Sequence, residues 1–291
     1  ANSSSKGGLF NKSSKGFTLK NVSVSGELTT SGAYNYIGGI VGDTSGDVEF
    51  INCDIHLTII VSGGNPTAVG GLIGRAQSAK TVRVKDSTVQ ADISVASASA
   101  VGGVVGNANS VTYVRMDSVE INTTINATGS LTGAGGVVGK ASLANGGTGA
   151  SELYLSNSGS TGSIFTTNIT AANTATNVGG LGGDIEEFYT GTYGNQVITN
   201  IKADELQSVG GVAGKGADLY CYYTTADSIV ISGQITGNYG SKIGGLYGEK
   251  TGQIVGNVVG ITSATNITVG QSSRTVSEVG GLFGSLSLTT K

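Results

Sequence analysis

The amino-acid sequence predicts an all-β protein, a parallel β-solenoid of about eight to nine coils with a period of about 32 residues and three short strands in each coil. Three observations predict it. A Gly-Gly-x-x-Gly string recurs at nearly constant spacing, the residues between its copies alternate between apolar and polar, and the 291 residues include one proline. A single repeat array implies one domain over residues 1–291.

The repeated string follows a small or branched apolar residue and occurs eight times. Counted from a truncated copy at Gly7, successive first glycines are 31, 32, 32, 33, 44, 31, 34 and 36 residues apart. The longest interval predicts an insertion near residues 141–150, and the first and last coils are expected to be incomplete. Stacked coils place equivalent residues above one another, so each coil needs glycine at a corner where φ is positive or the backbone approaches the next coil. The predicted structural glycines are Gly38, Gly39, Gly70, Gly71, Gly102, Gly103, Gly135, Gly136, Gly179, Gly180, Gly210, Gly211, Gly244, Gly245, Gly280 and Gly281.

The segments between the glycine strings have the period of two that is typical of β-strands. Examples are residues 81–85 (TVRVK), 89–95 (VQADISV), 228–232 (SIVIS) and 266–269 (NITV). We expect three strands in each period: the glycine string itself, a middle strand, and a third strand before the next string. The apolar residue after each glycine pair should form a buried ladder along the solenoid: Ile40, Leu72, Val104, Val137, Leu181, Val212, Leu246 and Leu282.

A β-propeller is the alternative architecture for all-β repeats of this length. Its blades need four strands and aromatic landmarks, whereas this chain has no tryptophan. A stacked coil leaves almost no position for a residue without an N–H group. The one proline, Pro66, lies in an expected turn at residues 62–67, which favours the solenoid.

The composition excludes several classes of protein. Charged residues are only 12% of the chain and the net charge is −3, so there is no electrostatic argument for binding nucleic acid. With 38% apolar residues the chain is not typical of disorder. No run of 18 or more apolar residues occurs, so we expect no membrane span.

The glycine string, repeated with β-patterned spacers, resembles the GLUG-motif repeats of large surface and secreted proteins. Residues 69–74 (VGGLIG), 209–214 (VGGVAG) and 279–284 (VGGLFG) carry the pattern most clearly. The resemblance covers the chain from Gly7 to Gly284, although the copy at 179–183 and the truncated first copy depart from it. It implies an extracellular location and an adhesive or spacer role.

Two glycine-rich strings partly match a phosphate loop, and one partly matches a calcium site. Lys140 and Lys215 follow Gly-Gly-x-x-Gly strings, but Ala141 and Gly216 stand where a phosphate loop requires Ser or Thr. Residues 179–184 (GGLGGD) match the start of a calcium-binding nonapeptide, which binds only when tandem copies stack. Asp184, Glu186 and Glu187 could supply oxygen ligands, but a solvated acidic edge is the favoured interpretation.

Catalytic chemistry is weakly represented in the sequence. His56, the one histidine, lies opposite Ile55 in an alternating segment, which favours an exposed position. A polysaccharide lyase or hydrolase would need acidic and basic groups converging on one groove. The densest acidic group is Asp43, Asp47, Glu49 and Asp54, near one corner and with no basic cluster beside it in the sequence. We therefore predict no enzyme, cofactor or metal site.

The two cysteines are Cys53 and Cys221, five repeats apart. Stacking at about 4.8 Å per coil separates them by roughly 24 Å. A disulfide needs Cα atoms within about 7 Å of each other. The sequence predicts two free, buried thiols.

Seven Asn-x-Ser/Thr sequons are glycosylation candidates. Four of them lie in the strand before a glycine string. In residues 121–126 (INTTIN) the isoleucines share one face, which points both asparagines outward. The candidates are Asn2, Asn11, Asn21, Asn122, Asn126, Asn168 and Asn266.

Both ends of the sequence fall within a coil and neither carries a cap, which solenoids need for solubility. Unpaired strand edges are templates for further pairing, and an open head-to-tail interface builds a filament. We therefore expect a non-enzymatic, glycosylated structural protein of the cell surface, part of a filament formed with copies of itself or of a longer solenoid.

Three other functions remain open. An adhesin that binds a glycan or a cell receptor is the main alternative. Exposed aromatic side chains along one face would favour it, and the candidates are Tyr189, Tyr193, Tyr220, Tyr222 and Tyr223. A polysaccharide-active enzyme ranks next. Ice binding ranks last, because no regular Thr-x-Thr ladder recurs from coil to coil.

Overall fold

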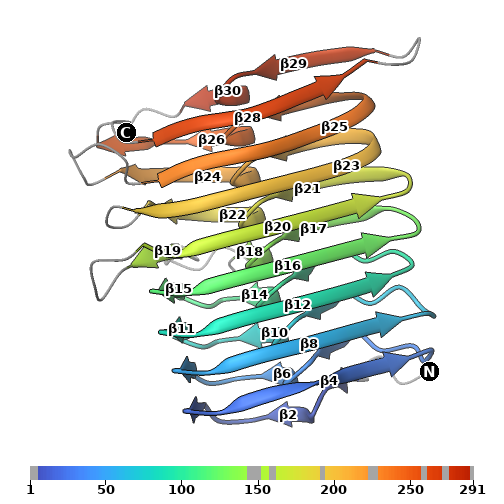
Figure 1. Cartoon of the computed structure of the whole chain (residues 1–291), viewed down its shortest axis with the longest axis vertical. Helices are drawn as coiled ribbons and strands as arrows, with labels where there is room; N and C mark the ends of the chain where they lie inside the picture. Colours follow the sequence, from blue (N-terminus) through green and yellow to red (C-terminus); the bar gives the residue numbers. More distant parts are fainter. Residues whose placement is uncertain are drawn as a thin grey trace.

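The computed structural model describes residues 6–142, 152–156, 162–190, 194–221, 229–256, 261–270 and 275–288. These residues form coils that stack on one another from the N-terminal end to the C-terminal end (Figure 1). Every pairing between described strands of neighbouring coils is parallel, as in β8 with β12 and β12 with β16. The predicted parallel β-solenoid is confirmed, and the expected insertion at 141–150 falls mostly outside the described residues.

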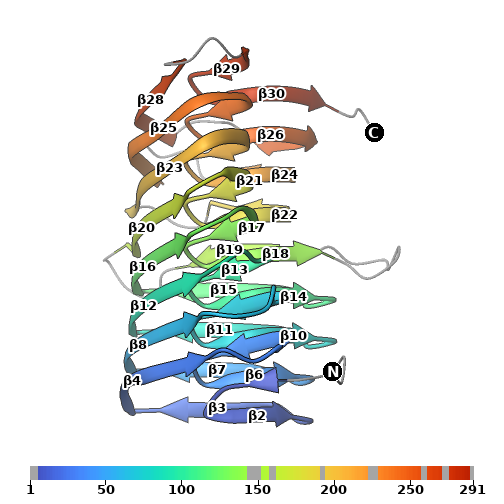
Figure 2. The ribbon, with the colours of Figure 1, turned by 90° about the vertical axis from the view of Figure 1, so that its right-hand side faces the viewer.

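Each of the first five coils, β1–β4 through β17–β20, contains four strands, so the prediction of three was wrong. The glycine string is two strands, one ending at its first glycine and one beginning three residues later, because the chain bends between them. Equivalent strands stack into four ladders that run the length of the solenoid (Figure 2). Among the described residues the ladders merge into two 15-stranded sheets, where single strands such as β23 and β22 serve two ladders.

The four ladders are defined by their strands. The long-strand ladder comprises β4 (Ser23–Thr30), β8 (Asp54–Val61), β12 (Thr88–Val95), β16 (Glu120–Ala127), β20 (Ile164–Ala171), β23 (Asn195–Gly210), β25 (Ile229–Gly244) and β28 (Ile261–Val269). The pre-glycine ladder comprises β1 (Lys6–Gly7), β5 (Tyr36–Gly38), β9 (Ala68–Gly70), β13 (Val101–Gly102), β17 (Leu131–Gly135), β21 (Thr174–Gly179), the second halves of β23 and β25, and β29 (Val276–Gly280).

The other two ladders form the second sheet. The post-glycine ladder comprises β2 (Phe10–Ser13), β6 (Val41–Thr44), β10 (Ile73–Gln77), β14 (Val105–Asn109), β18 (Val138–Ser142), β22 (Gly182–Tyr189), β24 (Ala213–Cys221), β26 (Tyr247–Gly252) and β30 (Phe283–Leu288). The outer ladder comprises β3 (Phe17–Lys20), β7 (Val48–Ile51), β11 (Thr81–Lys85), β15 (Tyr113–Asp117), β19 (Glu152–Ser156), the ends of β22 and β24, and β27 (Ile254–Gly256).

The glycine pair pinches each coil, because its second glycine touches the middle of the long strand. A Cβ atom on Gly103 would lie 2.0 Å from Oγ1 of Thr123 in β16. The same hydroxyl donates a hydrogen bond of 2.8 Å to the carbonyl of Gly136, one coil further on. Thr167 and Thr199 repeat this bond, to Gly180 and Gly211, at 2.7 Å each. The corner therefore needs glycine for close approach.

Of the two reasons expected for the glycine pairs, positive φ or close approach, only close approach applies. None of the sixteen predicted structural glycines has positive φ, and an added Cβ atom would meet another atom closer than 3.0 Å at all of them except Gly281. The left-handed residue lies two positions upstream of the first glycine in several coils, at Asn177, Ser208 and Lys242.

The pinch divides the apolar interior into two clusters. The larger one lies between the second sheet and the first half of the long strands, and it includes Phe50 and Ile55. The smaller one lies between the pre-glycine strands and the second half of the long strands, and it includes Ile37 and Ile59. The predicted aliphatic ladder is confirmed from Ile40 to Leu246, all fully buried. Leu282 is 37% exposed, because no described coil covers that end.

Two further predictions are confirmed. Pro66 lies outside the strands, in the connection between β8 and β9. Cys53 and Cys221 are both free and buried. Burial raises the pKa of the Cys221 thiol to about 11, so this thiol stays protonated and unreactive at neutral pH.

Candidate functional site

An alternating row of charges runs along the outward face of the post-glycine ladder. We call it the charge ladder. Its successive members, each paired with the next in register, are Lys12, Asp43, Arg75, Asn107, Lys140, Asp184, Lys215, Glu249 and Ser285. Opposite charges directly across neighbouring strands attract, so the row stabilises the stack. Lys140 and Lys215, which follow the two glycine strings compared with phosphate loops, lie on either side of Asp184 in the charge ladder.

Asp43 is the most buried member of the charge ladder, with a fully buried side chain. Arg75 donates two hydrogen bonds to its carboxylate, from Nε at 2.8 Å and from Nη2 at 3.0 Å. Lys6 Nζ lies 3.0 Å from Oδ2 of the same carboxylate. Burial by itself would raise the pKa of Asp43, but the hydrogen bonds from Arg75 and Lys6 outweigh it and hold the pKa below 3.8. Arg75 also lies on the ring of Tyr36, 3.9 Å from its centroid.

The predicted acidic group Asp43, Asp47, Glu49 and Asp54 is therefore corrected. It was expected to lack basic partners, but Arg75 binds Asp43 and Arg83 lies 3.8 Å from Glu49. These pairs join residues 32 and 34 positions apart, and only the stacking of coils brings them together. Asp54 lies elsewhere, on the long-strand ladder, where it contacts the half-exposed His56 at 3.1 Å. The exposed position expected for His56 is confirmed.

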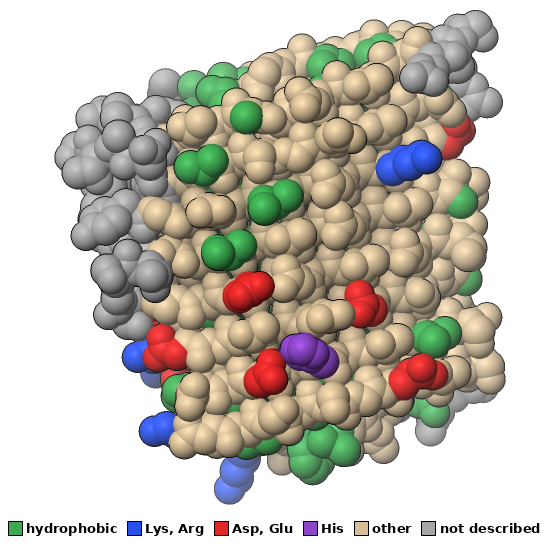
Figure 3. Space-filling model, viewed as in Figure 1, with side chains coloured by type: hydrophobic (Ala, Val, Ile, Leu, Met, Phe, Trp, Pro, Cys, Tyr) green, Lys and Arg blue, Asp and Glu red, His purple; other side chains and the backbone are tan. Residues whose placement is uncertain are grey.

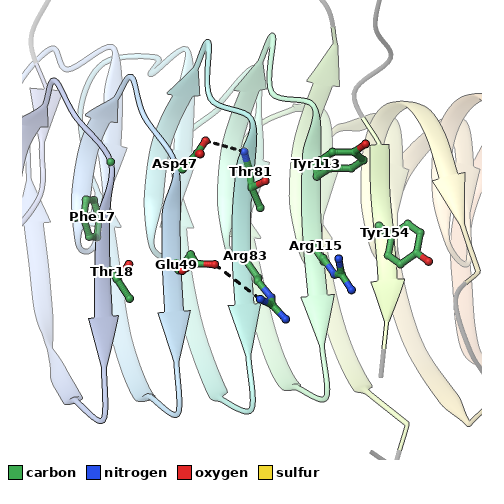
Figure 4. Close-up of a pocket in the computed structure, with 10 residues that line it drawn as sticks. Phe17, Thr18, Asp47, Glu49, Thr81, Arg83, Tyr113, Arg115 and Tyr154 are labelled. Atoms are coloured by element: carbon green, nitrogen blue, oxygen red, sulfur yellow. Dashed lines mark hydrogen bonds and ion pairs between the residues drawn. The ribbon is translucent and has the colours of Figure 1, made fainter. Parts of the chain in front are cut away.

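A groove follows the outward face of the outer ladder across five consecutive strands, β3, β7, β11, β15 and β19 (Figure 4). Its volume is about 930 Å³. We call it the Arg–Tyr groove, and it is lined by Gly16, Phe17, Thr18, Asp47, Glu49, Thr81, Arg83, Tyr113, Arg115 and Tyr154. Two rows of side chains, two residues apart along each strand, form the groove: Asp47, Thr81 and Tyr113 in one row, and Thr18, Glu49, Arg83, Arg115 and Tyr154 in the other.

Arg83 and Asp47 of the Arg–Tyr groove are bound to partners within the chain. Arg83 donates to the buried carboxylate of Asp117 at 2.7 Å and lies near Glu49. Asp47 accepts two backbone N–H groups, those of Lys80 and Thr81, at 2.7 and 3.0 Å. The groove is thus a surface of near-zero net charge with many fixed hydrogen-bonding groups.

Arg115 lies two residues after Tyr113 on β15 and directly across from Tyr154 on β19. Its Nε donates to Ser156 Oγ at 3.1 Å, and its guanidinium lies 5.3 Å from the centre of the Tyr154 ring. The two terminal nitrogens of Arg115 make no hydrogen bond with any described residue. Tyr113 is 41% exposed. Arg83, Arg115, Tyr113 and Tyr154 were missed in the sequence, where their only signal is a common phase within consecutive repeats of 32 and 39 residues.

A row of tyrosines continues the groove toward the C-terminal end. Tyr154, Tyr189 and Tyr220 stack in register, with ring centres 5.4 Å and then 4.4 Å apart, and the last pair is parallel to within 2°. Tyr189 and Tyr220 are thus members of one aromatic row, but both are half-buried and not exposed as the adhesin alternative expected. Tyr193, Tyr222 and Tyr223 lie outside the described residues.

Three carboxylates stack beside these tyrosines: Glu152, Glu187 and Asp218 occupy one register position of the outer ladder. Burial, and then repulsion from Glu187, raises the pKa of Glu152 from 4.5 to about 7. Burial also raises the pKa of Asp184, although Lys215 and Lys140 oppose the shift. Among the described residues, no three His, Cys, Asp or Glu side chains are grouped to hold a metal ion. The calcium set Asp184, Glu186 and Glu187 is therefore not assembled.

The raised pKa of Glu152 predicts that the protein is more stable in mild acid. The folded state keeps this proton up to about pH 7, whereas the unfolded chain loses it near pH 4.5. Stability should therefore fall as pH rises from 4.5 to 7, by on the order of 1 kcal/mol after solvent screening. Urea unfolding measured across this pH range checks it. The fall in unfolding free energy with pH should disappear in Glu152→Gln and remain in the control Glu27→Gln. An unchanged slope in Glu152→Gln would contradict the assignment.

The outward positions of the long-strand ladder are mostly uncharged and polar, and this face is nearly flat (Figure 3). Four sequon asparagines lie on it, Asn122 and Asn126 in β16, Asn168 in β20 and Asn266 in β28. None of them is buried, as expected. Asn168 accepts a hydrogen bond of 2.9 Å from Asn200 of the next coil. Asn11 and Asn21 are also exposed, and Asn2 lies outside the described residues.

One buried cation stands apart from these surfaces. Lys250 takes an inward position that carries Ala76, Ala108 and Ala141 in other coils. Its side chain is fully buried, and its amine donates to the carbonyls of Ala217 and Thr251. Burial lowers the pKa of Lys250 to about 8. The amine is held by backbone carbonyls and faces no described cavity.

The fold defines the class of this protein as a parallel β-solenoid with paired-glycine corners. No family model matches the chain, and searches of curated proteins and of solved structures returned no match. None of the described residues belongs to a helix long and apolar enough to cross a membrane.

Proposed function

We propose that this chain is a non-enzymatic structural protein of the cell surface, a segment of a filament or spacer built from stacked β-solenoid coils. One observation carries the proposal: equivalent residues of successive coils pair in constant register through all described coils, as in Ile55, Val89, Ile121 and Phe165. In such a stack each coil contacts only its neighbours, so length can be added in whole coils. The self-matched charge ladder supports the same role.

The first and last described coils expose apolar side chains at positions that inner coils bury. Leu9 and Phe10 are 65% and 54% exposed in the first coil, and Leu286 and Leu288 are 48% and 54% exposed in the last. The residue paired with Phe10 in the next coil, Val41, is fully buried. Apolar surface of this kind is stabilised when another coil covers it.

An extracellular location is part of the proposal. It rests on the resemblance to GLUG-motif repeats and on the exposed sequons of the long-strand face. N-linked glycans need an accessible asparagine side chain. None of the six described sequon asparagines is buried.

Immunogold electron microscopy of intact cells from the native source tests the proposal. We expect label along continuous surface fibres whose axial repeat is a multiple of the coil spacing, about 4.8 Å. Label on dispersed short rods would contradict the proposed filament, and label inside the cell would contradict the proposed extracellular location. Mass spectrometry of peptides that contain Asn122, Asn126 and Asn168 should find glycans, and unmodified asparagines at every sequon would remove the glycoprotein assignment.

A further inference from the structure

We infer that the Arg–Tyr groove binds a linear, neutral polysaccharide whose chain lies along the solenoid axis. Such a site goes beyond a structural role, because it would let the rod attach to a glycan surface. It also differs from the tyrosine set expected from the sequence, since its aromatic side chains are Tyr113 and Tyr154.

The shape of the groove fits a polymer. Its lining comes from five consecutive strands, and four steps of about 4.8 Å make it roughly 19 Å long. Its lining side chains follow the outward face of one ladder (Figure 4). The rise from coil to coil is close to the length that one pyranose adds to an extended glycan. Successive sugars can therefore meet successive coils in equivalent positions.

The side chains of the groove fit a sugar. Tyrosine offers an apolar ring face and a polar tip, which suits a pyranose with C–H groups on its faces and hydroxyls at its rim. Tyr113 and Tyr154 supply the rings, and Tyr113 is 41% exposed. The terminal nitrogens of Arg115, which bond to none of the described residues, supply donors, and the carboxylate of Glu49 supplies acceptors. The polar groups are held in place by bonds within the chain, so little ordering is needed when a ligand binds.

The charge balance favours a neutral ligand. Asp47, Glu49 and the adjacent Asp117 outnumber Arg83 and Arg115, and Arg83 is already paired with Asp117 at 2.7 Å. A polyanion would meet the two carboxylates of Asp47 and Glu49 on one coil of the groove, and the chain as a whole carries −3. A peptide strand is not favoured either, because the backbone of β7, β11 and β15 is paired on both edges and offers no free strand edge.

Affinity electrophoresis of the purified full chain tests the inference. Native gels contain hydroxyethylcellulose, xyloglucan or galactomannan as neutral probes, and polygalacturonate as the anionic probe. We expect at least one neutral polysaccharide to retard the protein. Tyr113→Ala and Arg115→Ala should each weaken binding about tenfold or more, which corresponds to the loss of about one ring stack or one paired donor set.

Two further variants separate binding from folding. Tyr113→Phe keeps the ring and should keep the affinity within about twofold. Tyr239→Ala, in β25 and outside the groove, should bind like the parent protein. Circular dichroism melts check that each variant is folded. The inference is overturned if no neutral polysaccharide retards the protein, if only polygalacturonate does, or if binding persists unchanged in folded Tyr113→Ala and Arg115→Ala.

Discussion

Gly103→Ala is expected to destabilise the protein by about 3 kcal/mol, at the upper end of the usual cost of overpacking. The new Cβ atom would lie 2.0 Å from Thr123 Oγ1 and 2.2 Å from the carbonyl oxygen of Gly136. Both contacts are inside the pinch, and the hydrogen bond between Thr123 and Gly136 would have to lengthen or break. Urea unfolding followed by circular dichroism measures the effect as a lower midpoint.

Gly281→Ala is the matched control for this variant. Gly281 is the second glycine of the last copy, and an added Cβ atom there meets nothing within 4 Å. We expect its unfolding midpoint to stay within about 0.5 kcal/mol of the parent protein. Equal stability of the two variants would show that the glycine pair is not required for close approach, and the account of the pinch would then be wrong.

Arg75→Met is expected to cost about 3 kcal/mol at pH 7, because it leaves the buried carboxylate of Asp43 with Lys6 as its one remaining ion-pair partner among the described residues. The variant also removes the guanidinium from the face of Tyr36. Methionine keeps most of the side-chain volume, so the loss reports the charge more than the packing. Thermal and urea unfolding of the variant and the parent protein measure the difference.

The double variant Asp43→Asn/Arg75→Met tests the cause. Removing the stranded charge should recover a large part of the lost stability. The pH dependence gives a second check. The lowered pKa of Asp43 stabilises the parent protein above pH 3.8, and this contribution is lost as the pH falls through the folded-state pKa. The defect of Arg75→Met should therefore shrink in acid. A double variant no more stable than Arg75→Met would contradict the assignment.

Much of the fold could be predicted from local patterns. Glycine spacing identified the coil, alternation identified the strands, and the residue after each glycine pair was correctly assigned to the core from Ile40 to Leu246. The free, buried state of Cys53 and Cys221 followed from their distance in repeats. The count of strands did not follow, because the pinch is a contact between Gly103 and Thr123, residues that share no local pattern.

The surface chemistry could be predicted only in part. Alternation is enough to place His56 and the sequon asparagines outward. It does not say which outward residues meet, because contacts such as that of Arg75 with Asp43 join different coils. A repeat with intervals of 31 to 44 residues also leaves the register between coils open by several positions. Since a shift of one residue reverses the face of every side chain, no groove can be assembled before the register is known.

The sequence by itself determined that this chain stacks into a β-solenoid, since a repeated glycine pair and an alternating strand pattern are local properties that hold in every coil. Tertiary structure alone decided that each coil is pinched into two compartments, that its charges form an alternating ladder, and that Tyr113, Arg115 and Tyr154 share one groove. The physical reason is that these features depend on backbone hydrogen bonds between coils, which align residues about 32 positions apart to within one step of a strand.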